Sequence, residues 1–519
     1  MNGADERSVD VRTWIGVLGT MLGAFMAILD LYITNASLRD ITGGIAATQD
    51  EGSWISTSYL IGEIVTVPLT AWLSRVFSLR WYLLGNVGLF LIFSCLCATA
   101  HSLDQLIWFR ACQGFTGGVM IPMALTVTMS MLPRNRQPLG LMMFGITGTL
   151  GPPLGLTVGG WLTATYGWPW VFYVNLLPGA LMLAAILFAF NRAPMQLSLL
   201  RRGDWLGMIC MCVGLGSLTA MLEEGQRDDW FSSSFIQICA LLAAFFIPAF
   251  VFVELARNKP LVNLRLIAGR NLGIASAVNF IMGVALYGSV YLLPQYLTLV
   301  QGYDALQTGQ VMIWVGLPQL IIFPFVPRLM KSFDLRAMVC FGCLVFAASS
   351  WLNTSMSPGY AGDQFAFPNV IRALGQPFTL MPLSLLATSL LQPTDIGDGS
   401  AVFTITRNIG GSVGTALLDT LLTRREQFYD FEIGTSINHY RPLVEDRIQA
   451  LTTAFVNKGY DTVTATQQAY AQIKNIVREN AYVMAFSDAF LAVAAALVAG
   501  ALLVWFCRPV RMRDHGAAE

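Results

Sequence analysis

Apolar stretches alternate with short polar breaks along almost the whole chain. A helix that crosses a bilayer needs about 20 mostly apolar residues, and windows of that length recur in pairs. We predict fourteen spanning helices, at approximately 14–36, 54–73, 81–101, 105–131, 138–162, 170–190, 204–222, 232–254, 272–296, 308–327, 336–353, 366–391, 399–422 and 483–506. The pattern therefore predicts an all-α integral membrane protein.

The distribution of Lys and Arg predicts the orientation of these spans. An even number of spans places both termini on one side of the membrane. With a cytoplasmic N-terminus, the predicted cytoplasmic segments hold most of the 31 basic residues, and the short outer loops hold only Arg39 and Arg227. By the positive-inside rule, both termini are expected in the cytoplasm, which places the long polar segment 423–482 on the outer side.

An internal repeat follows the second and the tenth predicted spans. Residues 68–80 and 324–336 are related by a constant offset of 256, and five of the thirteen positions are identical. The two copies lie eight spans apart, so they have the same orientation. The simplest arrangement is two six-helix halves, 1–192 and 259–519, with an inserted helix pair at 193–258. Parallel halves around a central site are typical of rocking secondary transporters.

Composition supports a membrane location and argues against bound cofactors. The chain of 519 residues is 55% hydrophobic and 12% charged, against about 25% charged in soluble domains. All nine cysteines fall in apolar runs and are interpreted as small core residues. Cys340 and Cys343 have no second pair and no His nearby, so we expect no metal site and no cofactor.

Three ionisable residues interrupt the first four spans. Asp30, Glu63 and Arg110 each stand alone in an apolar stretch, at a cost of roughly 2.5 to 3.5 kcal/mol per charge. A rise of about 1.5 Å per residue places all three in one layer, so Arg110 is expected to pair with Asp30 or with Glu63.

Proton coupling is the function that we predict for this group. A carboxylate would alternate between binding a proton and facing arginine or substrate, and Asp30→Asn is expected to abolish pH-driven transport. A static salt bridge that holds helices together is the alternative. The histidines, His101, His439 and His515, fall in loops or the tail, so coupling rests on carboxylates.

Small residues form a stripe on the fifth span and another on the thirteenth. Their spacing of three or four residues predicts close helix packing at a seam that opens and closes between the halves. The predicted packing and gating residues are Gly148, Gly151, Pro152, Gly155, Gly159, Gly160, Arg407, Gly410, Gly411 and Gly414. Aromatic and amide side chains near the repeat interface are the predicted lining of a substrate cavity: Phe25, Tyr59, Gln113, Asn279, Tyr287, Tyr291 and Gln295.

Several short motifs, taken in order, resemble one family. They are Leu29-Asp30 with Ile33, Asn35 and Ala36; Phe109-Arg110 with Gln113-Gly114; Gly155 with Gly159-Gly160, Trp168 and Asn175; Leu293-Pro294-Gln295; and Thr406-Arg407 with Gly410-Gly411. In these the chain resembles the major facilitator superfamily, specifically its fourteen-span drug:proton antiporters of the EmrB/QacA type. The chain departs from that pattern at Arg75, where the superfamily usually has Asp, and at Glu63, where these relatives often carry a neutral residue.

The resemblance implies a proton-coupled exporter of amphiphilic toxic compounds or drugs that works by alternating access in the bacterial inner membrane. Its implied partners are protons, an amphiphilic small molecule, the lipid bilayer, and a periplasmic membrane-fusion adaptor with an outer-membrane channel; no nucleic acid is expected. Transport of a specific metabolite or siderophore, including import by symport, stays open, and so does a sensor that transports nothing. The chain has no Gly-x-x-x-x-Gly-Lys-Ser/Thr and no His-Glu-x-x-His, so we expect neither ATP drive nor an enzyme.

Overall fold

The computed structural model describes residues 10–48, 51–133, 136–257, 262–392, 395–437 and 441–510; His439 and His515 lie outside these ranges. Every regular element within them is helical. The first part of the chain forms α1 (Val11–Ala36), α2 (Leu38–Gly44), α3 (Ser53–Phe77), α4 (Leu79–Ala98), α5 (Leu103–Gly117), α6 (Met120–Met131), α7 (Gln137–Tyr166), α8 (Trp170–Tyr173) and α9 (Leu176–Ala189).

The middle of the chain forms two long helices with short 3-10 turns. These elements are η1 (Leu197–Arg202), α10 (Trp205–Glu224), η2 (Trp230–Ser232) and α11 (Ser234–Ala256). The remainder forms η3 (Leu264–Ala268), α12 (Arg270–Leu299), α13 (Ala305–Ile322), α14 (Val326–Ser332), α15 (Leu335–Leu352), η4 (Asn353–Ser355), α16 (Gly362–Thr388), α17 (Ile396–Ser436), α18 (Pro442–Asn457), α19 (Thr462–Leu503) and η5 (Val504–Phe506).

Thirteen helical segments of the described chain are long and apolar enough to cross a membrane, which confirms the predicted all-α membrane class. The thirteenth predicted span, 399–422, lies within α17, which is not among the thirteen helices counted. Asp398, Arg407, Asp419 and several glycines lower the hydropathy of that helix. The predicted count is therefore close to the observed one, and the difference arises at the helix that carries the most charge.

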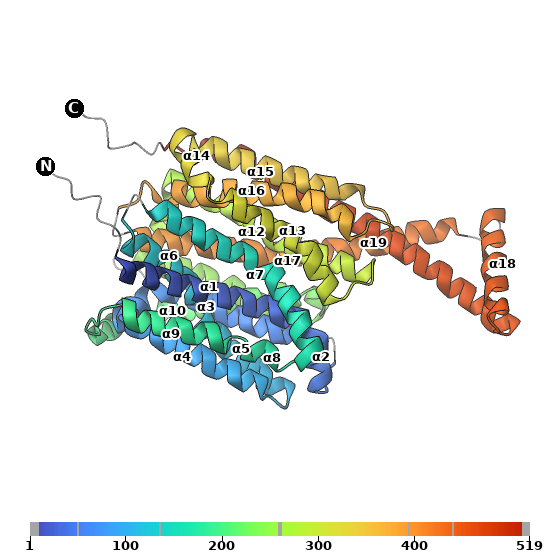
Figure 1. Ribbon diagram of the computed structural model, residues 1–519, viewed down its shortest axis with the longest axis horizontal. Coiled ribbons are helices and arrows are strands. Elements are labelled where there is room, and N and C mark those ends of the chain that lie inside the picture. Colours follow the sequence, from blue (N-terminus) through green and yellow to red (C-terminus); the bar gives the residue numbers. More distant parts are fainter. Residues whose placement is uncertain are drawn as a thin grey trace.

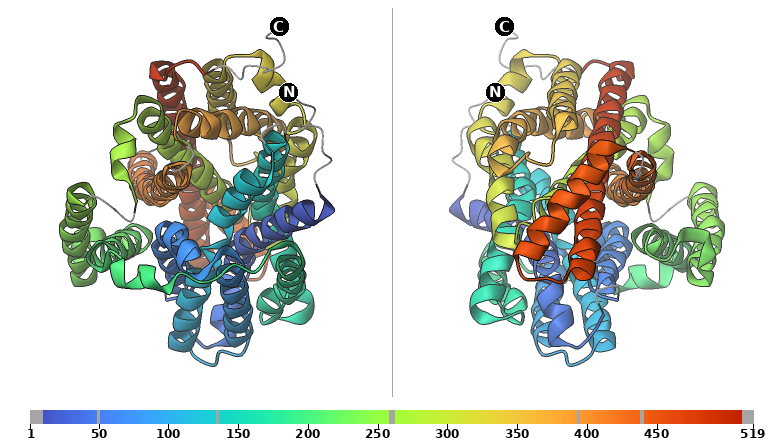
Figure 2. Two further views of the ribbon diagram at one scale, coloured as in Figure 1. Left: turned by 90° about the vertical axis from the view of Figure 1, so that its left-hand side faces the viewer. Right: turned by 90° about the vertical axis from the view of Figure 1, so that its right-hand side faces the viewer.

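The helices pack as two groups that meet along two seams. In the first group α1 contacts α7 and α9, and α5 contacts α3 and α4; in the second α12 contacts α17, and α16 contacts α13 and α15. Between the groups, α7 packs along α13, and α3 touches α17. The pair α10 and α11, drawn in green in Figure 2, lies at one edge of the bundle, where α10 contacts both α3 and α17.

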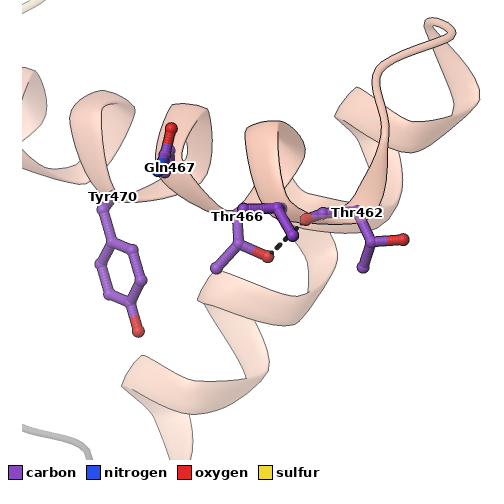
Figure 3. Close-up of a pocket in the computed structure, with 5 residues that line it drawn as sticks. Thr462, Thr466, Gln467 and Tyr470 are labelled. Atoms are coloured by element: carbon purple, nitrogen blue, oxygen red, sulfur yellow. Dashed lines mark hydrogen bonds between the residues drawn. The ribbon is translucent and has the colours of Figure 1, made fainter.

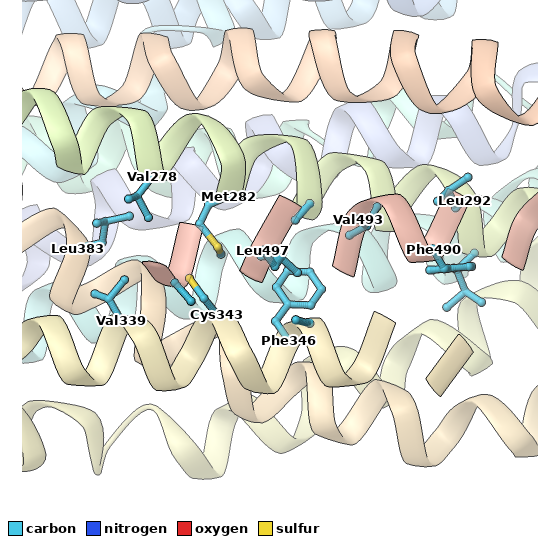
Figure 4. Packing of buried hydrophobic residues seen from close by; sticks show 14 of the residues in the cluster. Val278, Met282, Leu292, Val339, Cys343, Phe346, Leu383, Phe490, Val493 and Leu497 are labelled. Atoms are coloured by element: carbon cyan, nitrogen blue, oxygen red, sulfur yellow. The ribbon is translucent and has the colours of Figure 1, made fainter. Parts of the chain in front are cut away.

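Apolar side chains fill the interior of each group. In the second group, Met282 from α12, Phe346 from α15 and Leu497 from α19 belong to one buried cluster (Figure 4). Cys343, which the sequence placed in the core, lies in the same cluster and is a free thiol. The apolar faces of helices from distant parts of the sequence thus hold this half of the bundle together.

The long polar segment 423–482 forms the end of α17, all of α18 and the first turns of α19, which together we call the helical projection. α17 continues past its predicted end at 422 as far as Ser436, and α19 begins at Thr462, well before its apolar part. Figure 1 shows α18 and the first turns of α19 projecting from one end of the bundle.

Glycines allow close approach along the seam between α1 and α7. A Cβ on Gly155 would lie 2.6 Å from Cβ of Tyr32, and one on Gly159 would lie 2.8 Å from the carbonyl oxygen of Ile33. Gly151 is similarly crowded, whereas a Cβ built on Gly148 would meet no neighbouring helix of the described chain within 4 Å. Three of the four predicted stripe glycines therefore face α1 directly. A larger residue at those three positions would push α7 away from α1.

Candidate functional site

Arg110 forms a buried ion pair with Asp30. The Nη1 of Arg110 lies 2.6 Å from Oδ2 of Asp30, and neither side chain is exposed to solvent. Gln113 and Asn175 donate from their amides to Oδ1 of the same carboxylate, at 3.1 and 2.5 Å. Asp30 therefore has three donors around it, which come from α5 and from the start of α9.

Aromatic and main-chain groups complete the surroundings of Arg110. Its guanidinium stacks 4.3 Å from the ring centre of Tyr59, and its Nε donates to the carbonyl of Ile55 at 3.3 Å. The hydroxyl of Tyr59 donates to the carbonyl of Ala27 at 3.3 Å. These contacts join α1, α3 and α5 within the first half of the chain. Of the two pairings that the sequence left open, the structure contains Asp30 with Arg110.

Glu63 stands outside this network, on the side of α3 that faces the second half of the chain. It is half-buried and makes no hydrogen bond or ion pair with any described residue. Arg407 of α17 is close enough to interact with it electrostatically. Gly118, at the break between α5 and α6, packs on it: a Cβ there would lie 2.8 Å from the Glu63 carbonyl oxygen.

Tyrosines and a second arginine surround the space between Glu63 and Arg407. Tyr32 of α1 interacts electrostatically with Glu63, with Tyr287 of α12 and with Arg372 of α16. Tyr287 also interacts electrostatically with Arg407 and Glu63. The structure thus gathers one carboxylate, two guanidinium groups and two phenols from both halves. We call Tyr32, Glu63, Tyr287, Arg372 and Arg407 the central cluster.

The residues predicted to line a substrate cavity lie in different places. Tyr287 belongs to the central cluster, and Phe25 packs in an apolar core of the first half. Tyr59, Gln113 and Asn279 are fully buried; Asn279 donates to the carbonyl of Phe403 at 2.6 Å and so ties α12 to α17. Tyr291 and Gln295 lie further along α12 and are half-buried. A shared cavity formed by all seven side chains stays a prediction.

A cluster that the sequence did not single out lies at the C-terminal end of α10. Glu224 is fully buried and accepts hydrogen bonds from Thr57 at 2.5 Å and Ser53 at 2.9 Å, both on α3. The adjacent Glu223 is hydrogen-bonded to Ser412 of α17. Two adjacent glutamates at the end of α10 thus contact different halves of the protein: Glu224 contacts α3 of the first half, and Glu223 contacts α17 of the second. Their isolation at the end of an apolar run was the signal available in the sequence.

Two hollows lie away from the central cluster. A cavity of about 20 Å³, large enough for one water, lies between the halves; it is lined by Thr70, Met123 and Ser400 among others. A shallower one lies on the projection, beside Thr462, Thr466 and Tyr470 of α19 (Figure 3). In the described ranges no group of three His, Cys, Asp or Glu side chains could hold a metal ion.

Comparisons with known proteins agree with this architecture. Residues 20–415 match the family model described as Major Facilitator Superfamily. The chain is 32% identical over 504 residues to the colistin resistance protein EmrB of Acinetobacter baumannii, covering 97% of this chain and 98% of that protein. It is 29% identical over 497 residues to the multidrug export protein EmrB of Escherichia coli, covering 95% of each.

A solved structure supports the fold alone. The human organic anion transporter MFSD10 superposes with a TM-score of 0.59 at 13% identity, and the match covers 95% of this chain and 99% of that one.

Proposed function

Because this chain belongs to the major facilitator superfamily, we propose that it exports amphiphilic toxic compounds, drugs among them, in exchange for protons by alternating access. Drug efflux is supported by the nearly full-length similarity to multidrug export proteins of the EmrB type. The chain is a multi-pass membrane transporter and not an enzyme. We place it in the bacterial inner membrane with both termini in the cytoplasm.

The position of Glu63 is the observation that carries the proton-coupling part of the proposal. Glu63 has no hydrogen-bond or ion-pair partner in the described chain, and Arg407 of the other half interacts with it electrostatically. An ionised Glu63 attracts Arg407 across the boundary between the halves, and a proton on Glu63 removes that attraction. Proton binding would therefore change the relative stability of two arrangements of the halves, as alternating access requires.

Asp30 and Arg110 have a positioning role in this proposal. Their ion pair is fully buried, its hydrogen-bond partners in the described chain all come from the first half, and Arg110 stacks on Tyr59, which interacts electrostatically with Glu63. The pair would hold α3 so that Glu63 faces the second half. The sequence left open which carboxylate carries the proton, and we assign that role to Glu63.

We propose that the packing glycines have a gating role, and their close approach to neighbouring helices supports it. Gly160 of α7 approaches α13, since a Cβ there would lie 3.0 Å from Cβ of Ala305. Gly410, Gly411 and Gly414 of α17 lie equally close to α12. We propose that sliding at these contacts accompanies the exchange between inward and outward access, and that the cavity residues predicted above contact the substrate in one of those states.

The helical projection is our proposed contact for a periplasmic adaptor that leads to an outer-membrane channel. Exposed apolar side chains lie on it: Phe431 on α17 is 73% exposed, Leu443 on α18 is 84% exposed and Val463 on α19 is 68% exposed. Burial of these apolar side chains against a partner would stabilise such a contact.

Glu63→Gln tests the proton-coupling proposal. In proteoliposomes with an imposed pH gradient, this variant should lose proton-driven substrate movement and retain counterflow, in which labelled substrate exchanges for unlabelled substrate without a gradient. Undiminished proton-driven transport would overturn the role of Glu63.

Glu51→Gln is the matched control. Glu51 is an exposed carboxylate just before α3, and hydrogen bonds from the Thr48 side chain and backbone lower its pKa. Removal of its charge should leave both activities unchanged. Proton-driven accumulation in the opposite direction would instead support the alternative that the protein imports a metabolite by symport.

A further inference from the structure

Arg372 is a buried cation that lacks the counter-ion found in the other half of the protein. It is 4% exposed, and its Nε has no hydrogen-bond partner in the described chain. Among the described residues, its one hydrogen bond runs from Nη2 to the carbonyl of Leu286, at 3.4 Å. Its guanidinium also lies 5.3 Å from the ring centre of Phe346. An arginine in these surroundings favours any anion that can reach it.

Comparison of the two halves identifies what is missing. Leu286 follows Asp30 by 256 residues, which is the offset of the internal repeat. Asp30 pairs with Arg110 at 2.6 Å, whereas the matching position beside Arg372 carries leucine. The first half therefore supplies its own carboxylate to its arginine. The second half offers an apolar side chain and a carbonyl in that place.

The group that faces Arg372 comes from the opposite half. Tyr32 of α1 is the titratable side chain of the described ranges that interacts with it electrostatically. Tyr32 in turn lies beside Glu63 and Tyr287, so Arg372 belongs to the central cluster that both halves form. An anion bound to Arg372 would contact both halves and would respond to their relative movement.

We propose that Arg372 binds the anionic head group, a carboxylate or a sulfonate, of amphiphilic substrates, and that Leu286 keeps this arginine free for them. This inference rests on the proposed export function and adds a substrate class to it. Guanidinium groups recognise such anions through two parallel N–H donors, and the unbonded Nε of Arg372 is one of them. The alkyl or aromatic part of the substrate would lie against the apolar side chains around the site.

The inference is tested by a substitution that places a carboxylate beside Arg372. Leu286→Asp should give Arg372 an internal partner that competes with the substrate, and Leu286→Asn has nearly the same shape without the charge. The probes are two dansyl amphiphiles with the same alkyl chain, one ending in a sulfonate and the other in a trimethylammonium group. Binding to the purified full-length protein is followed by dansyl fluorescence, and transport is followed in proteoliposomes with a pH gradient.

We expect Leu286→Asp to weaken sulfonate binding and transport by about tenfold or more, since a charge-assisted contact is lost. The trimethylammonium probe should change by less than about twofold. Leu286→Asn should leave both probes close to wild type, and Arg372→Lys should keep more sulfonate binding than Arg372→Met. Equal effects on the two probes, or no sulfonate binding by the wild type, would overturn the inference.

A failure of the proposed export function gives a different combination of binding and transport results. If the wild type moves neither probe but binds the sulfonate in a manner that Leu286→Asp abolishes, the anion site stands and the proton-driven function falls.

Discussion

Asp30→Asn should destabilise the fold strongly. Asp30 is fully buried, its carboxylate lies 2.6 Å from Arg110, and two amides also donate to it. The substitution leaves Arg110 buried without a counter-charge. Loss of one partner of a buried pair costs about 3 to 5 kcal/mol in the free energy of unfolding. The side-chain amide of Asn would also place its N–H groups against N–H donors whose hydrogen bonds the carboxylate oxygens of Asp30 accept in the wild type.

The double variant Asp30→Leu/Arg110→Met should recover most of that loss, because a buried pair replaced by apolar residues of similar volume is often close to neutral. Unfolding is measured in mixed micelles with a thiol-reactive dye, since Cys97 is a free thiol with no exposed surface in the folded protein. Asp104→Asn is the control; this exposed carboxylate lies in the first turn of α5 and should cost less than about 1 kcal/mol.

Two results would refute this reasoning. An Asp30→Asn protein that unfolds within about 0.5 kcal/mol of wild type would show that the ion pair does not stabilise the bundle. A folded Asp30→Asn protein that keeps counterflow but loses pH-driven transport would assign the proton to Asp30, one of the two carboxylates that the sequence left open.

Three further predictions concern helix contacts. Gly155→Leu should impair transport more than membrane insertion, because its side chain would meet α1, whereas Gly148→Leu should be tolerated because nothing lies within 4 Å there; equal loss of insertion and transport in Gly155→Leu would favour a packing role alone. Thr57→Val should lower the free energy of unfolding by about 1 to 3 kcal/mol, measured in mixed micelles, because a buried carboxylate at the end of α10 loses a donor; an unchanged value would mean that the contact adds no stability. Cysteines at Gly160 and Ala305, where α7 meets α13, should cross-link on mild oxidation and block transport until reduced; transport by the cross-linked protein would show that this seam does not open.

The sequence predicted much of the fold because the governing signals are local. Runs of apolar residues, the breaks between them and the distribution of basic residues predicted the all-α membrane class and a span count close to that observed. Asp30, Glu63 and Arg110 were recognised because an isolated charge in an apolar run is visible without any tertiary information. The one apolar window that the helix count omits, in α17, is also the one with the most charges.

Tertiary structure decided which of these charges meet. Spacing could not distinguish Asp30 from Glu63 as the partner of Arg110, since both lie in one layer, and Asn175 reaches Asp30 from 145 residues away. The proximity of Glu63 to Arg407 and the lack of a carboxylate beside Arg372 depend on how two halves pack, which no local pattern encodes. Charge pairing is a property of distances between helices, whereas membrane insertion is a property of each helix by itself.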